Sequence, residues 1–160
     1  MSTSPTRDAQ LVRQLRWSLV GLSVLTCIGS ALELAMLRHW GSTDQKIPWV
    51  VLVFLAAGIM TFAWRQTRGT ILAARALAVV SVLGSGFGVL EHVKSNVETA
   101  PLNALWADTW DTLSPINQWW LAATGGAGTA PTLAPGFLAL TGICLALATW
   151  RLRPGDPGLR

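Results

Sequence analysis

Four long apolar segments constrain the fold of this chain more than any other feature. They cover Leu15–Leu37, Ile47–Trp64, Thr70–Leu90 and Thr132–Trp150. Only three charged residues fall inside them, namely Arg16, Glu33 and Arg75. A transmembrane helix needs about 20 mostly apolar residues to cross a hydrocarbon core of roughly 30 Å. The segments lack the two-residue alternation of barrel strands, so the sequence predicts an all-α integral membrane protein with four transmembrane helices.

The composition agrees with lipid as the surroundings of this chain. Charged residues make up 12% of the sequence and hydrophobic residues 51%, whereas a soluble domain has about 25% charged residues. A net charge of +4 could indicate nucleic-acid binding in a soluble protein, where basic residues gather on one face. Here the basic residues lie between apolar segments, so we expect the lipid bilayer as a partner and no nucleic acid.

The apolar segments predict the organisation of the whole chain. We expect a cytoplasmic tail over residues 1–14, a transmembrane domain over 15–150 and a second cytoplasmic tail over 151–160. The four helices are expected at about residues 15–38, 47–65, 70–92 and 132–151. The loop at 93–130 then lies on the outer side of the membrane.

The distribution of arginine and lysine predicts the orientation. Nine basic residues fall in the segments that would be cytoplasmic: Arg7, Arg13, Arg16, Arg65, Arg68, Arg75, Arg151, Arg153 and Arg160. Three fall in the outer segments: Arg38, Lys46 and Lys94. Basic residues favour the cytoplasmic side. The prediction is therefore that both termini are cytoplasmic (N-in/C-in), in a prokaryotic plasma (inner) membrane.

The outer loop has two stretches with helical patterns. Apolar residues recur at helical spacing in the first stretch, at Leu102, Leu105, Trp106, Trp110 and Leu113. This pattern is typical of a helix that lies in the membrane interface. The second stretch begins with Ser114 and Pro115, which suit an N-cap and a first helical position. We expect one or two short interfacial helices here, between the third and fourth transmembrane helices.

Small residues on three of the predicted helices indicate where the helices pack together. In lipid, helices associate by close approach of their backbones, which small side chains allow. The predicted packing residues are Ser30, Gly84, Gly88 and Gly142. The same contacts could join this chain to a second copy of itself or to a subunit of a larger membrane complex.

A possible ligand site follows from four ionisable residues near the predicted outer ends of the first and third helices: Glu33, His39, Glu91 and His92. An ionisable group within a membrane span is rare and is a functional hypothesis by default. Helical geometry favours Glu33 with Glu91 or His92 as the inner pair and leaves His39 at the rim. Carboxylate and imidazole groups suit a transition metal, and paired histidines suit a haem. A hydrogen-bonded polar cluster that binds nothing is the alternative, and no cofactor is the expectation.

Three functional classes remain open. The first is a non-enzymatic membrane protein that acts in assembly, with itself or with a larger membrane complex. The second is a ligand-binding or redox protein that uses Glu33, Glu91 and His92 for a metal, a haem or a quinone-like ligand. The third is a proton-coupled transporter component that uses Glu33. No catalytic residues are predicted, and we expect the first class.

Overall fold

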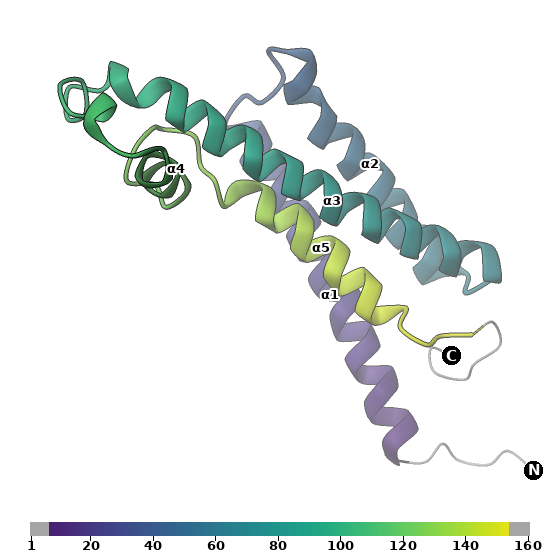
Figure 1. Cartoon of the computed structure of the whole chain (residues 1–160). Coiled ribbons are helices and arrows are strands. Elements are labelled where there is room, and N and C mark those ends of the chain that lie inside the picture. Colours follow the sequence, from purple (N-terminus) through teal and green to yellow (C-terminus); the bar gives the residue numbers. More distant parts are fainter. Residues whose placement is uncertain (1–6, 154–160) are drawn as a thin grey trace, which may run out of the picture. The chain divides into compact units, whose positions relative to one another are not determined.

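The computed structural model describes residues 7–153, which contain helices and turns and no strand. The α-helices are α1 (Arg7–Met36), α2 (Thr43–Trp64), α3 (Arg68–Thr99), α4 (Pro115–Ala123) and α5 (Ala134–Ala148). Two 3-10 turns, η1 (Ala100–Leu102) and η2 (Trp110–Thr112), lie between α3 and α4 (Figure 1). The all-α prediction is confirmed for this part of the chain.

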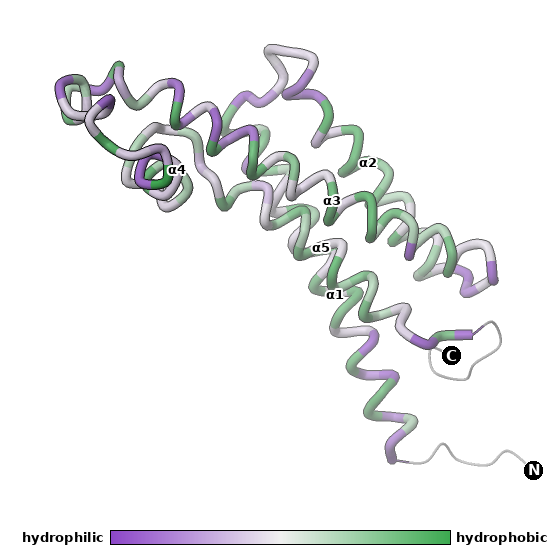
Figure 2. Tube along the Cα trace, viewed as in Figure 1, coloured by the Kyte–Doolittle hydropathy of each residue, from purple (hydrophilic) through white to green (hydrophobic). Residues whose placement is uncertain are grey.

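Three of these helices are long and apolar enough to span a membrane, namely α1, α2 and α3. Apolar residues dominate α2 and the middle of α1, whereas polar residues concentrate toward helix ends and turns (Figure 2). The start of α2 is fixed by a capping box, in which the Ser42 hydroxyl accepts from the Gln45 backbone N–H and the Gln45 side chain accepts from the Ser42 N–H. Two helices are longer than predicted: α1 begins at Arg7, and α3 continues to Thr99.

The chain divides into two compact units, which we describe separately. Unit 1 comprises Met1–Leu83 and Phe137–Arg160, and unit 2 comprises Gly84–Gly136. Residues 1–6 and 154–160 belong to the predicted tails and lie outside the described residues.

Unit 1 is built from α1, α2, the first part of α3 and α5 from Phe137 onward, while the first three residues of α5 belong to unit 2. Its core includes Leu55, Phe62 and Leu145, each at most 1% exposed. Many apolar side chains face outward instead, and Leu25 and Val53 are 65% and 66% exposed. Such a surface suits lipid or a partner chain better than water.

Helix α5 is shorter than the helix predicted over residues 132–151. It has 15 residues, which gives a length of about 22 Å, less than the roughly 30 Å of a bilayer core. Turns replace its predicted ends, at Thr132–Leu133 and at Thr149–Arg151. In the turn after the helix, Arg151 adopts a backbone φ of 53°. The fourth membrane crossing therefore stays a prediction.

Unit 2 contains the last part of α3, the two 3-10 turns, α4 and a glycine-rich connection. The predicted helix over SPINQWW is present as α4, with the Ser114 hydroxyl accepting from the Asn117 N–H. The prediction of an α-helix from Leu102 to Leu113 was wrong. The 3-10 turn η1 ends at Leu102, and the 3-10 turn η2 forms later in this stretch. The Asn103 carboxamide accepts from the Leu105 N–H at 2.9 Å, and such local bonds compete with a helix.

Candidate functional site

The four residues of the predicted ligand site are divided between the two units. Glu33 and His39 belong to unit 1, and Glu91 and His92 belong to unit 2. Their convergence on one site stays a prediction, and each pair is described below in its own surroundings.

Helix α1 ends before His39, so Glu33 is helical and His39 is not. Arg38 adopts a φ of 51°, and its N–H donates to the Ala35 carbonyl while the His39 N–H donates to that of Leu34. These two bonds form a Schellman motif, which closes a helix. The His39 carbonyl accepts from the Trp49 indole at 2.8 Å. His39 is thereby fixed as part of the turn after α1. The position of its ring therefore cannot be predicted from helical spacing.

Glu33 lies on α1 one turn beyond Ser30. Glu33 is half-buried, whereas Ser30 is 3% exposed and its hydroxyl has no hydrogen-bond partner in the described structure. A buried hydroxyl without a partner costs about 1–3 kcal/mol. Residues three apart on a helix share a face, so the predicted packing residue and the predicted ligand residue are neighbours.

His92 is held by a backbone carbonyl of its own unit. Its Nδ1 lies 2.9 Å from the Pro131 carbonyl oxygen. Because a carbonyl oxygen only accepts, Nδ1 carries the hydrogen in this contact, and in a neutral ring Nε2 is then the acceptor nitrogen. Glu91, the preceding residue on α3, is exposed.

Two observations concern a possible metal site and the similarity of this chain to known proteins. Within residues 7–153, no group of three or more His, Cys, Asp or Glu side chains is arranged to hold a metal ion. The chain matches no protein-family model, no curated protein and no solved structure. Function must therefore be argued from this chain's own contacts.

The predicted packing glycines differ in their surroundings. A Cβ at Gly142 would lie 2.8 Å from the Ala78 carbonyl oxygen and 3.1 Å from the Ser81 Cβ, so α5 and α3 approach closely there. A Cβ at Gly88 would lie 3.2 Å from that of Pro135. At Gly84 a Cβ would meet nothing within 4 Å. The packing role predicted for Gly84 stays a prediction, and it would require a second molecule.

Polar side chains link the helices of unit 1 through their interior. The Thr141 hydroxyl donates to the Thr26 hydroxyl at 2.8 Å, which joins α5 to α1. The Ser81 hydroxyl donates to the Leu138 carbonyl at 2.6 Å, which joins α3 to α5. These three side chains are buried. Their polar atoms are therefore used to hold one helix against another.

Two arginines bind the C-terminal end of α5, a role that the sequence did not suggest. Arg75 on α3 donates from Nη2 to the carbonyls of Thr149, at 2.6 Å, and Leu152, at 3.2 Å. Arg16 on α1 donates to the Trp150 carbonyl at 3.1 Å. The last carbonyls of a helix have no partner within the helix and carry partial negative charge. The arginines bind carbonyls of the turn that directly follows α5, where their positive charge also faces the negative end of the helix, and they join α1 and α3 to this turn.

Asn96 organises unit 2 and was also missed. It is fully buried, donates to the carbonyls of Ala122 and Ala130, and accepts from the Ala130 N–H at 2.7 Å. Gly128, with a φ of 81°, packs so closely on Asn96 that a Cβ would overlap its side chain. A signal did exist in the sequence, because Val93 and Asn96 on α3 and Ala100 at the start of η1 recur at helical spacing, and all three are buried.

Proposed function

We propose that this chain is an integral membrane protein whose four long apolar segments all cross the bilayer and whose function is assembly, with itself or within a larger membrane complex. The observation that carries the proposal is how unit 1 uses its polar groups. Its buried hydroxyls at Thr26, Ser81 and Thr141 bond across helices, while apolar side chains face outward. A chain built in this way offers lipid or another chain an apolar surface.

The short helix α5 is compatible with a fourth crossing. Irregular backbone at membrane depth is tolerated where it is buried in protein and its polar groups are satisfied. Thr149 and Leu152 are 0% and 4% exposed, and Arg75 binds the carbonyls of both. The turn after α5 can therefore extend the crossing without exposing backbone to lipid.

The contacts of Arg16 and Arg75 support the predicted orientation. They bring the basic parts of α1 and α3 to the C-terminal end of α5, as expected if these ends share the cytoplasmic side. Reporter fusions after Arg160 and near Asn117 should give opposite signals. A cytoplasmic signal from the Asn117 fusion would contradict the orientation.

Assembly can be tested through Gly84. The full chain, extracted in mild detergent, should give native masses above the 17.1 kDa of one copy. Gly84→Leu should shift this distribution toward one copy without unfolding the chain, because position 84 is open within the chain. Gly86→Leu is the matched control, since position 86 is equally open but turned about 160° away. A wild type that is only monomeric would contradict the proposal.

A second candidate function, proton or cation transfer at Glu33, is favoured by one observation. The Ser30 hydroxyl is buried without a partner one turn from Glu33, and unsatisfied buried polar groups require an explanation such as an unseen ion or water. Glu33→Gln should then abolish ion or proton flux in vesicles while leaving the helical content unchanged. Equal flux from Glu33→Gln and wild type would exclude this function.

A further inference from the structure

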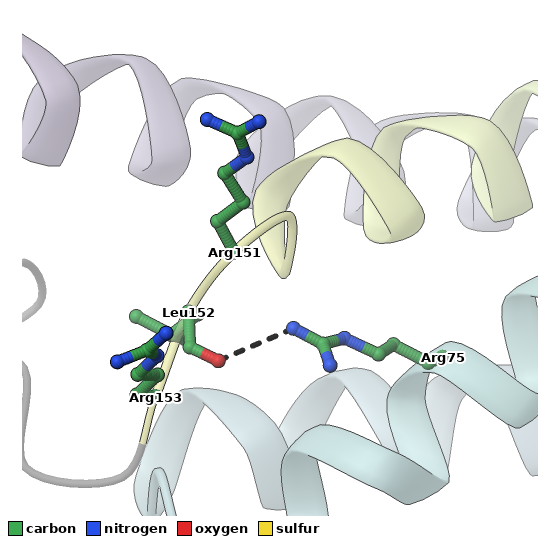
Figure 3. A pocket seen from close by; sticks show the side chains of 4 residues that line it. All are labelled: Arg75, Arg151, Leu152 and Arg153. Carbon is green, nitrogen blue, oxygen red and sulfur yellow. Dashed lines mark hydrogen bonds between the residues drawn. The ribbon is translucent and has the colours of Figure 1, made fainter.

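The C-terminal end of α5 borders a pocket with an unusual lining. The pocket has a volume of about 570 Å³ and is lined by Arg75, Arg151, Leu152 and Arg153 (Figure 3). Arg75 reaches it from α3, and the other three belong to the segment that follows α5. All four residues belong to unit 1. Three arginines therefore contribute to the lining of one pocket.

Arg75 is a fixed part of this lining. Its Nη2 donates to the carbonyls of Thr149 and Leu152, and Figure 3 shows the bond to Leu152. A guanidinium has five N–H groups in a rigid plane. Two of them make these bonds, and the N–H groups of Nε and Nη1 have no acceptor among the described residues. The planar fork is thus held in place with donors to spare.

Arg151 occupies its position against a backbone preference. Its φ of 53° is the left-handed conformation at the end of a helix, where glycine is the usual residue. For other residues this conformation is costly, and such strain is most often found where the side chain has a use. The Arg151 guanidinium makes no hydrogen bond or ion pair with any other residue of 7–153, and Figure 3 shows it extended away from Arg75. Nothing within the described chain explains an arginine here.

We propose that this pocket binds the phosphate of an anionic lipid headgroup in the cytoplasmic leaflet. Guanidinium forks match phosphate oxygens, and basic pockets beside transmembrane helices on the cytoplasmic side suit anionic headgroups. A bound phosphate also offsets the mutual repulsion of the three positive charges that line the pocket. The inference rests on the proposed membrane location and orientation.

The surroundings of the pocket favour a lipid over a free anion. Trp150, next to Arg151 in the chain, is 65% exposed, and tryptophan is enriched at the headgroup level. On the preceding turns of α5, Leu147 and Ile143 are 50% and 45% exposed. A phosphate in the pocket would place attached acyl chains beside this apolar face.

Arg151→Gly provides a test in which the fold should survive. Glycine favours the left-handed conformation, so the melting temperature should stay equal or rise, while a headgroup contact is lost. The full chain is purified in detergent, and phosphatidylglycerol binding is titrated by native mass spectrometry. We expect Arg151→Gly to weaken that binding about five-fold, since each basic residue near an anionic surface contributes about 1 kcal/mol. Phosphatidylcholine binding should not change.

Arg38→Gly is the matched control. Among residues 7–153, Arg38 and Arg151 are the two residues other than glycine that have a positive φ, and the φ of Arg38 is 51°. Arg38 closes α1 at the end that carries His39. Its replacement should affect stability as Arg151→Gly does and leave phosphatidylglycerol binding unchanged. Equal binding by wild type and Arg151→Gly, or equal losses in both variants, would overturn the proposal.

Two further measurements distinguish a lipid phosphate from free phosphate, and loss of lipid binding from loss of membrane integration. Inorganic phosphate is titrated as competitor, and if it displaces the lipid at comparable concentration, the pocket is a free-anion site and the lipid proposal is wrong. Extraction of native membranes with alkaline carbonate tests membrane integration. A chain released by carbonate would overturn the proposed function and this inference together, whereas an integrated chain whose lipid binding ignores Arg151 would overturn the inference alone.

Discussion

Units 1 and 2 are stabilised in different ways. In unit 1, long apolar helices approach one another at small residues such as Gly142, and single hydroxyls bond between them. In unit 2, short elements surround Asn96, whose carboxamide bonds three backbone groups. A continuous helix makes its backbone hydrogen bonds within itself, so neighbouring helices need only pack closely together. Irregular backbone needs side chains as hydrogen-bond partners. The two units should therefore respond oppositely to changes in polar groups and in volume.

The largest expected effect comes from Asn96→Ala in unit 2. The carbonyls of Ala122 and Ala130 and the Ala130 N–H would lose their partner, at a cost of about 2–4 kcal/mol. Limited proteolysis within residues 103–130 should accelerate, while the far-ultraviolet signal of the long helices stays. Asn117→Ala is the control, because Asn117 lies exposed on α4. Resistance of Asn96→Ala to the protease would show that unit 2 does not depend on this network.

Gly142→Ala tests close approach in unit 1. The added methyl would lie 2.8 Å from the Ala78 carbonyl oxygen, so α5 must move away from α3. We expect a loss of about 2 kcal/mol in unfolding free energy, typical of overpacking. Gly84→Ala should instead be neutral or stabilising, because position 84 is open and alanine favours a helix. Thermal unfolding followed by circular dichroism checks both, and equal melting temperatures would remove the close-approach explanation.

Gly88→Leu and Gly86→Leu apply the same comparison to α3 within unit 2. A Cβ at Gly88 would lie 3.2 Å from the Pro135 Cβ, whereas one at Gly86 meets nothing within 4 Å. We expect Gly88→Leu to be less stable than Gly86→Leu by about 1 kcal/mol. A Gly86→Leu variant that melts first in the same detergent would contradict this order.

The smallest effect is expected for Thr141→Val in unit 1. Valine keeps the shape of threonine but loses the bond to the Thr26 hydroxyl, and bonds between membrane helices average about 0.6 kcal/mol. Thr61→Val serves as the control, because the Thr61 hydroxyl bonds only within its own helix, to Ala57 and Gly58. If Thr141→Val lost more unfolding free energy than Asn96→Ala, the proposed difference between the two units would be wrong.

Most of the α-helices could be predicted from the sequence because each is specified by the residues of its own segment. Long, mostly apolar segments and the polar residues between them predict α1, α2 and α3, and Ser114 and Pro115 predict the start of α4. The end of α5 could not be found in this way. It depends on Arg75 and Arg16, which lie far from it in the sequence and bind the carbonyls of Thr149 and Trp150 in the turn that follows α5.

What the sequence by itself determined is therefore the helical class, three long apolar helices and the residues with unusual chemistry, such as Glu33 and His92. Local hydropathy and backbone hydrogen bonding within each segment are sufficient for that. Only the tertiary structure decided that Asn96 holds unit 2 together and that Arg75 and Arg151 line a common pocket. These relations depend on contacts between residues distant in sequence, and no periodicity along a single segment records which distant backbone group a side chain will bind.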